Sequence, residues 1–335
     1  MKWIGLVDNT EHVCCRYRLA AFRPILERAG HALELLPLPS SWWKRAALFQ
    51  NLRGENVIVQ RRLLAGWQRQ LLRRSVRRLL FDFDDAVFLR DSYAAKGLHD
   101  RRRFHRFVGM VRCADAVIAG NTFLAERAAR WTSARSIQVI PTCVDPQLYL
   151  PIEKASTRSG VDLVWVGSAS TLRGLQAIAP LLEAVGRSVP GVRLKLVCDR
   201  FLTLRDLPIV PVPWKQATEA EEIAAADIGI SWLPDDAWSR GKCGLKVLQY
   251  LAAGLPVVAN PVGVQWEMVR HGETGFLAQS PDRWIEAISR LAGDGELRHR
   301  MGQAGRQLVQ ARYSVGAGAA KWVRILDRLR EPLAA

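Results

Sequence analysis

The stretch from Arg240 to Ala278 combines glycine and lysine in a way that suits phosphate binding. It reads RGKCGLKVLQYLAAGLPVVANPVGVQWEMVRHGETGFLA, in which a glycine-bearing loop enters a helix that stops at Gly254. Glycine lets backbone N–H groups approach a ligand, and the start of a helix offers free donors and a positive dipole. Lys242 and Lys246 add full charges at the same end. The pattern predicts a phosphate-binding turn, although a solvated loop before an ordinary helix has the same spacing.

Carboxylates gather in the first half of the chain, in the run FDFDDAVF. Asp82, Asp84 and Asp85 end a predicted strand there. Clustered carboxylates can hold a metal ion or act as a base, and the residue types leave both open. A loop with Asn9, Arg16 and Arg18 follows the first predicted strand. It is a candidate ligand-facing loop, because open α/β sheets bind ligands at the carboxyl ends of strands. Two arginines at a solvated helix start are the alternative.

The apolar pattern predicts strands and helices in alternation. Strands are expected at 2–7, 32–36, 56–60, 79–83, 114–118, 137–140, 163–166, 193–198, 209–213, 228–232 and 256–259. Helices are expected at 18–29, 64–78, 175–188, 219–226 and 245–253. Because the strands are continuous apolar runs, they predict buried parallel sheets covered on both faces. The polar stretch 153–160 (EKASTRSG) is interpreted as a linker. The fold expected is therefore two doubly wound α/β domains.

Length and charge narrow the class of protein. The chain has 335 residues and a formal net charge of +16, and residues 1–150 hold 25 basic and 13 acidic side chains. The basic half suggests an anionic partner there. The six cysteines lack C-x-x-C spacing, and neither a signal peptide nor a transmembrane segment is predicted, so a cytoplasmic location is expected. Nucleic acid is not expected as a partner, because no helix-turn-helix, RNP, KH or zinc signature accompanies the charge.

Several motifs in order resemble one family. The run KVLQYLAAGLPVVANPVG followed by HGETGFLA resembles the donor-nucleotide motif of the GT-B glycosyltransferases, in the retaining group 1 often called family 4. VIPTCVD, LVWVGSASTLRGLQ and AAADIGISWLP fit the same family. The resemblance implies two Rossmann-like doubly wound domains facing a cleft. An acceptor-side domain is expected at 1–152, a donor domain at 161–312, and a C-terminal helix at 313–335 packing back towards the N-terminal domain.

The resemblance also implies a donor site. Gly167 matches the glycine of the family's first donor loop, whereas Ser168 stands where an arginine is usual and Arg173 where a lysine is usual. A large subgroup places a lysine at the position of Lys246. Arg173 and Lys246 are therefore expected to stabilise the departing diphosphate, without a metal or other cofactor. Donor contacts are expected from Gly167, Ser168, Trp214, Lys242, Gly244, Leu245 and Gln249.

One departure from the family is clear. The family's paired glutamates fall on Gly241 and Gln249 in this chain. Gln249 can still hydrogen-bond a ribose diol, but Gly241 has no side chain to offer the donor sugar. The resemblance places Asp84 and Asp85 on the acceptor side as catalytic groups, with Asn9, Arg16 and Arg18 near the acceptor. It implies front-face attack without a protein nucleophile.

The basic half has features of a membrane-contacting surface. Trp42 and Trp43 stand beside Lys44 and Arg45, and Arg73 and Arg77 follow in a segment, 67–80, whose apolar residues can share one helical face. A solvated arginine-rich face is the alternative. The function expected is transfer of a sugar from a nucleotide diphosphate sugar to an envelope, polysaccharide or lipid-linked acceptor, by a peripheral enzyme at the cytoplasmic membrane face. The alternative is an inactive GT-B protein that binds a nucleotide sugar or a glycan.

Overall fold

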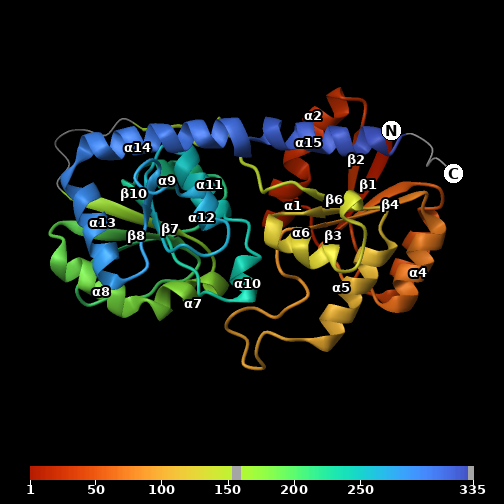
Figure 1. Cartoon of the computed structure of the whole chain (residues 1–335), viewed down its shortest axis with the longest axis horizontal. Coiled ribbons are helices and arrows are strands. Elements are labelled where there is room, and N and C mark those ends of the chain that lie inside the picture. Colours follow the sequence, from red (N-terminus) through yellow and green to blue (C-terminus); the bar gives the residue numbers. More distant parts are fainter. Residues whose placement is uncertain (153–159, 331–335) are drawn as a thin grey trace. The chain divides into compact units, whose positions relative to one another are not determined.

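The computed structural model describes residues 1–152 and 160–330 and groups the chain into two compact units (Figure 1). Unit 1 comprises Met1–Cys143, Asp236–Cys243 and Val315–Ala335. Unit 2 comprises Val144–Asp235 and Gly244–Ser314. Except for Gly160, the expected linker 153–160 lies outside the described residues, as do the last five residues of the expected C-terminal helix.

Unit 1 is built on a six-stranded parallel sheet in the order β2-β1-β3-β4-β5-β6. Its strands are β1 (Lys2–Val7), β2 (Ala32–Pro37), β3 (Asn56–Gln60), β4 (Arg78–Phe83), β5 (Ala116–Ala119) and β6 (Ile137–Val139). Each of the six strands predicted in this half is present to within two residues at either end. The order of strands reverses between β1 and β3, and open α/β sheets bind ligands at such a reversal.

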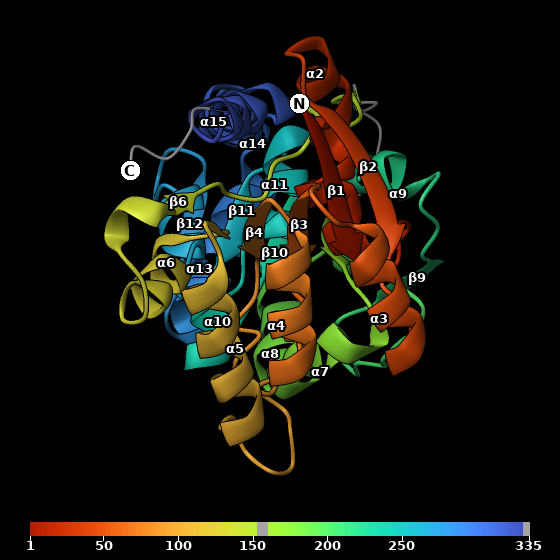
Figure 2. The same cartoon turned by 90° about the vertical axis from the view of Figure 1, so that its right-hand side faces the viewer.

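Helices cover both faces of the sheet of unit 1. They are α1 (Val13–Arg18), α2 (Arg23–Arg28), α3 (Trp42–Asn51), α4 (Gly66–Ser75), α5 (Arg101–Cys113), α6 (Thr122–Ala129), α10 (Ala237–Arg240) and α15 (Val315–Arg328). Figure 2 shows α3, α4 and α5 side by side, in orange to gold. Their apolar side chains pack with Val57 and Val59, whereas Ile58 packs with residues of α1, α2 and α15. Strand side chains alternate between faces, so the continuous apolar run of β3 supplies both cores.

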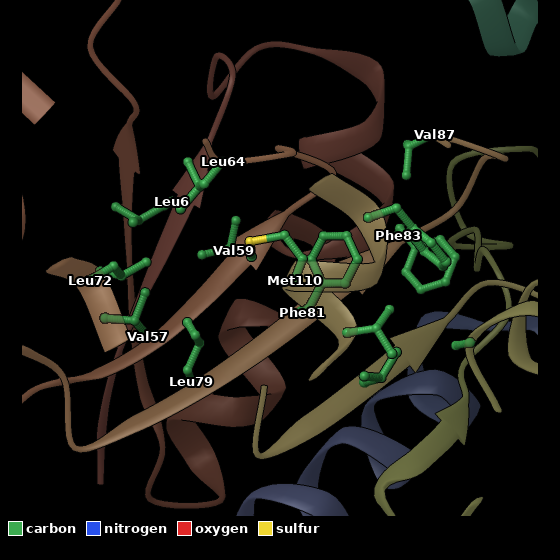
Figure 3. Packing of buried hydrophobic residues seen from close by; sticks show 14 of the residues in the cluster. Leu6, Val57, Val59, Leu64, Leu72, Leu79, Phe81, Phe83, Val87 and Met110 are labelled. Carbon is green, nitrogen blue, oxygen red and sulfur yellow. The ribbon is translucent and has the colours of Figure 1, made fainter. Parts of the chain in front are cut away.

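The core on the α3–α5 face is closely packed. Figure 3 shows Phe81 and Phe83 of β4 near Met110 of α5, with Leu72 of α4 among the surrounding aliphatic side chains. The rings of Phe81 and Phe83 stack with their centroids 5.1 Å apart. All four side chains are fully buried. This packing holds β4 firmly up to the point where its carboxyl end delivers the aspartates.

Unit 2 is built on a second six-stranded parallel sheet, in the order β12-β11-β10-β7-β8-β9. Its strands are β7 (Val161–Val166), β8 (Val192–Cys198), β9 (Ile209–Pro213), β10 (Ile228–Ser231), β11 (Val257–Ala259) and β12 (Gly275–Leu277). Its helices are α7 (Ala169–Ala177), α8 (Ala179–Ser188), α9 (Glu219–Ala224), α11 (Leu245–Ala252), α12 (Gln265–Met268), α13 (Pro281–Gly293) and α14 (Gly295–Leu308). In Figure 1, α8 and α13 lie on one face of the sheet and α9 and α11 on the other. Here the strand order reverses between β7 and β10.

Three predicted helices differ from the structure. The helix expected at 18–29 is divided into the end of α1, a 3-10 turn at Ala20–Phe22 and α2. Pro24 lies in the first turn of α2, where its missing N–H is tolerated. The helix expected at 175–188 is likewise divided, with Pro180 in the first turn of α8. The helix expected at 64–78 ends at Ser75, and Leu79 and Leu80 lie in β4. The amphipathic face predicted over 67–80 is therefore wrong, because its last residues belong to the sheet.

Both sheets are parallel and doubly wound, which confirms the predicted α/β fold class of two Rossmann-like units. The order in unit 2 is that of dinucleotide-binding sheets, and the order in unit 1 extends the flavodoxin-like one. Within 1–152 and 160–330, no helix is both long and apolar enough to cross a membrane.

Candidate functional site

Arg61 organises the reversal point of unit 1. It follows β3 directly and has φ of 58°, in the left-handed region that residues other than glycine rarely adopt. Its guanidinium lies 2.9 Å from a carboxylate oxygen of Asp84 and 2.7 Å from one of Asp85. Backbone strain of this kind persists where surrounding contacts hold it. The sequence did not mark Arg61 as a site residue, although its position directly after a buried strand was a usable signal.

The charges at this point hold Asp84 ionised. Burial works against the charge of Asp84, but Arg61 and Arg18 bring its pKa below the ordinary value. Burial and the carboxylate of Asp84 raise the pKa of Cys14, so this thiol stays protonated. Asp84 is thus suited to accept hydrogen bonds rather than to take a proton. In the described ranges, no group of three or more His, Cys, Asp or Glu residues is placed to hold a metal ion.

Lys242 lies beside the carboxylate of Asp85 in unit 1. Its ammonium lies 3.6 Å from a carboxylate oxygen of Asp85 and 5.0 Å from the ring centre of Trp238. The Asn121 amide donates to the carbonyl of Lys242 at 3.0 Å and holds the segment in place. The structure therefore brings this expected donor residue to the expected acceptor carboxylates.

Gly241 has a packing reason to lack a side chain. A Cβ built on it would lie 2.7 Å from the Cβ of Ala86 and 2.8 Å from the Ala86 nitrogen. Contacts under 3.0 Å require one of the two segments to shift. The glutamate that the resemblance places at this position would not fit the observed conformation.

Arg18 is not at a ligand surface. Expected at the acceptor side, it is instead fully buried, paired with Asp82 and donating to the Ile140 carbonyl. Burial opposes its charge, but Asp82 raises the pKa of Arg18 above its ordinary range. Asn9 and Arg16 lie nearer the surface: Asn9 is exposed and accepts from the Glu11 nitrogen, and Arg16 is half-buried. The sequence could not distinguish Arg18 from Arg16, because burial is decided by distant partners.

Gly167 and Lys246, two expected donor residues of unit 2, both lie against the ring of Trp165. A Cβ on Gly167, directly after β7, would lie 2.3 Å from that ring. The ammonium of Lys246, in the first turn of α11, lies 4.0 Å from its centre. Trp165 therefore connects the loop at the strand-order reversal to the start of α11. Nothing in the run VWVG marked this tryptophan as part of the site.

The turn before α11 requires its glycine. Gly244 is the N-cap residue of α11 and has φ of 66°. A Cβ there would lie 2.6 Å from the sulfur of Met268. Leu245 follows as the first helical residue and is half-buried. The glycine thus lets the chain turn tightly into the helix that carries Lys246.

The start of α7 already has an anionic partner. Ser168 is its N-cap residue, and the next backbone nitrogen, that of Ala169, donates to the Asp199 carboxylate at 2.6 Å. Hydrogen bonds from Cys198 and Ala169 lower the pKa of Asp199. Asp199 was not singled out from the sequence, although it directly follows β8. Because Asp199 occupies this helix start, Lys246 and the start of α11 are the better phosphate contacts.

The remaining expected donor residues are more scattered. Arg173 is exposed on α7. The indole of Trp214 is 39% exposed in the loop after β9 and donates to Glu219 at 2.9 Å. Gln249 is only 2% exposed, and its amide donates to the buried Tyr149 hydroxyl at 2.9 Å. Gln249 therefore reaches a ribose only if this contact is exchanged.

The residues expected to face a membrane differ in their exposure. Trp42, Trp43 and Lys44 are exposed at the start of α3, and Arg77 is exposed after α4. Arg73 instead pairs with Asp115 at 3.3 Å, inside unit 1.

Comparisons with known proteins bear on the class of fold and on the family that the chain resembles. Residues 237–308 match the family Glycosyl transferases group 1. A D-inositol 3-phosphate glycosyltransferase of Segniliparus rotundus is 27% identical over 230 residues, which are 60% of this chain and 50% of that protein. The chain thus spans about half the length of the curated relatives it matches.

Solved structures resemble the chain over almost its full length. Sucrose-phosphate synthase from Thermosynechococcus elongatus has a TM-score of 0.74 at 19% identity, covering 98% of this chain and 99% of that one. HepE of Anabaena, in complex with UDP and glucose, has a TM-score of 0.72 at 16% identity, covering 98% and 100%.

The fold is thus that of the GT-B class of α/β proteins. Within that class, the chain resembles the group 1 glycosyltransferases, whose signature lies in the segment that contains α11. The resemblance to this family that the sequence indicated is confirmed over residues 237–308.

Proposed function

We propose that the chain transfers a sugar from a nucleoside diphosphate sugar to a glycan or lipid-linked acceptor. The observation that carries this proposal is the meeting of Gly167 and Lys246 on Trp165. It lies where the strand order of unit 2 reverses, which is where open α/β sheets bind nucleotides. The complex of HepE with UDP and glucose supports a nucleotide sugar as donor.

Lys246 and the start of α11 are proposed to hold the diphosphate. When the bond between the sugar and the diphosphate breaks, negative charge grows on the leaving phosphate, and fixed positive charge there lowers the barrier. The exposed Arg173 adds a second cation when its side chain folds over the phosphates. This chemistry uses side chains of the protein alone, so we propose a reaction that does not depend on a metal.

Asp84 and Asp85 are proposed to orient the acceptor. Arg61 holds both carboxylates and keeps Asp84 ionised, so they can accept hydrogen bonds from acceptor hydroxyl groups. The attacking hydroxyl approaches the face that the diphosphate leaves, and the leaving phosphate oxygen takes its proton. The new bond then has the configuration of the old one. No protein nucleophile takes part.

The acceptor is proposed to be an envelope, polysaccharide or lipid-linked glycan reached at the cytoplasmic face of a membrane. The excess of basic residues in the first 150 positions, 25 against 13 acidic, supports an anionic surface as a partner.

Incubation of the purified chain with individual nucleotide sugars tests the proposal. Release of the free nucleoside diphosphate is followed with and without extracted envelope glycans or lipids. We expect one donor to be consumed faster when acceptor is present, and its nucleoside diphosphate to raise the melting temperature. Binding without turnover would instead identify the inactive nucleotide-sugar module. Failure of every nucleoside diphosphate to bind would refute the donor site itself.

A further inference from the structure

A hollow of about 600 Å³ opens on the surface of unit 1 beside the first turns of three helices. Its lining residues are Trp42, Arg45, Ala65, Trp67, Gln68, Arg102 and Arg106. The first two belong to α3, the last two to α5, and Trp67 and Gln68 to α4. Within the described part of the chain, this lining includes aromatic and basic side chains but no acidic one. The hollow brings together aromatic and basic side chains from three helices that are separate in the sequence.

Two tryptophans form one wall of the hollow. Trp42 is 65% exposed and Trp67 47%, and their rings meet edge to face with centroids 6.1 Å apart. Trp43 beside them is also exposed, with the ammonium of Lys44 5.2 Å from its ring. Exposing a cluster of large apolar rings to water is unfavourable, so such a cluster indicates a surface that contacts a partner. An indole has an apolar body and one N–H, which suits the headgroup level of a bilayer.

The arginines in and beside the hollow repel one another. Burial, followed by repulsion from Arg62 and Arg106, lowers the pKa of Arg45. Burial and Arg102 likewise lower the pKa of Arg106. Like charges held this close raise the free energy of the unbound surface, and an anion placed among them would relieve it.

The carboxylates nearest these arginines are already engaged. Asp8 acts on Arg45 but pairs with Arg62 at 2.5 Å. Asp100 acts on Arg106 but pairs with Arg90 at 2.9 Å. The positive charge of the hollow is therefore available to a ligand from outside the chain.

We propose that this hollow binds the phosphate of an anionic membrane lipid. Arg45, Arg102 and Arg106 surround the phosphate, while Trp42 and Trp67 lie among the headgroups. A soluble phosphate would use the arginines only, whereas a bilayer uses both the arginines and the exposed rings. The proposal rests on the membrane-face location in the proposed function and does not depend on sugar transfer. Arg102 and Arg106, rather than the Arg73 expected from the sequence, are the proposed lipid contacts, because Arg73 is paired within unit 1.

Vesicle binding by the full chain tests the charge. Flotation is compared between phosphatidylcholine vesicles and vesicles that also contain phosphatidylglycerol. We expect binding to the anionic vesicles only, weakened by salt. Arg102→Gln with Arg106→Gln should weaken it about 25-fold, at roughly fivefold for each arginine. The matched control is Arg324→Gln with Arg328→Gln, which removes the same charge from α15 and should change binding much less.

Fluorescence tests the tryptophans. Lipids with brominated acyl chains should quench the emission of the bound protein, and Trp42→Ala with Trp67→Ala should remove most of that quenching. The control is Trp266→Ala, which removes a tryptophan of unit 2 that is 62% exposed. Affinity for the nucleoside diphosphate should be unchanged in every variant, so the membrane proposal and the donor site can fail separately.

Three results would overturn the proposal. One is an equal loss of vesicle binding in the α15 control, which would indicate a general charge effect. Another is quenching that survives loss of both tryptophans. The third is tight binding of glycerol phosphate, sensitive to the change at Arg102 and Arg106, without vesicle binding, which would make the hollow a site for a free phosphate.

Discussion

Replacing Lys246 with methionine probes the proposed donor site of unit 2 most directly. Lys246 is half-buried in the first turn of α11, with its ammonium 4.0 Å from the ring centre of Trp165. Methionine keeps an unbranched apolar stem, so it can pack on the same ring without the charge. The variant therefore removes the interaction with phosphate and preserves most of the packing.

The size of the effect follows from this position. Two unit charges about 4 Å apart interact by about 4 kcal/mol at an effective dielectric constant near 20. A hydrogen bond to a charged group has a net worth of about 1.5–3 kcal/mol. Taking about 2–3 kcal/mol for a half-buried lysine, the affinity for a nucleoside diphosphate should fall about 30- to 150-fold. Loss of the contact with Trp165 changes the free energies of the free and the bound protein by similar amounts, so it largely cancels from the binding free energy.

Calorimetric titration with a nucleoside diphosphate and with its parent nucleoside separates the phosphate contribution. Lys246→Met should weaken the diphosphate and leave the nucleoside unchanged, because the nucleoside has no charge for the lysine to meet. Lys96→Met, at an exposed lysine of unit 1, is the matched control and should change neither. If both ligands weaken equally, or if neither weakens, Lys246 does not contact the diphosphate and the donor-site reasoning is wrong.

Three further substitutions test the units. Asp82→Asn should lower the free energy of unfolding by about 3–5 kcal/mol in urea denaturation, because it leaves buried Arg18 without its carboxylate; an unchanged midpoint would contradict that role. The lowered pKa of Asp84 stabilises the fold fully above its ordinary value of 3.8, and this contribution is lost as the pH falls from there through the folded pKa. Acid titration of stability should therefore be shallower in Asp84→Asn, and an equally steep curve would argue against the lowered pKa. Gly302→Ala should destabilise by about 1–3 kcal/mol despite the better helix propensity of alanine, since its Cβ would lie 1.9 Å from the Gly254 carbonyl oxygen; a higher melting temperature would show that the helix can move away.

Much of the fold was predictable because its signals are local. Continuous apolar runs such as 56–60 and 163–166 predict buried parallel strands, since both faces of the strand must be covered. Helix divisions were missed at Pro24 and Pro180, although the proline effect is also local. The end of α4 was missed for another reason: Leu79 fits a helical period equally well until the sheet pairs it with Val57.

The candidate site was predictable only in part. The motif around α11 identified Gly244 and Lys246 from spacing, because a glycine turn into a helix is a short-range feature. The partners of these residues were not predictable. Trp165 carries no mark in the sequence, and Asp199 is separated from the helix that it caps by thirty positions.

Local sequence patterns indicate the class of fold, the resemblance to the group 1 glycosyltransferases and the loops that follow the predicted strands. Which charged residues in those loops are functional candidates depends on the tertiary structure. It buried Arg18, aligned Arg61 with Asp84 and Asp85, and brought Lys242 to the same carboxylates. The reason is that strand and helix signals depend on neighbours in the chain, whereas the burial and pairing of a charge depend on residues that only folding brings near.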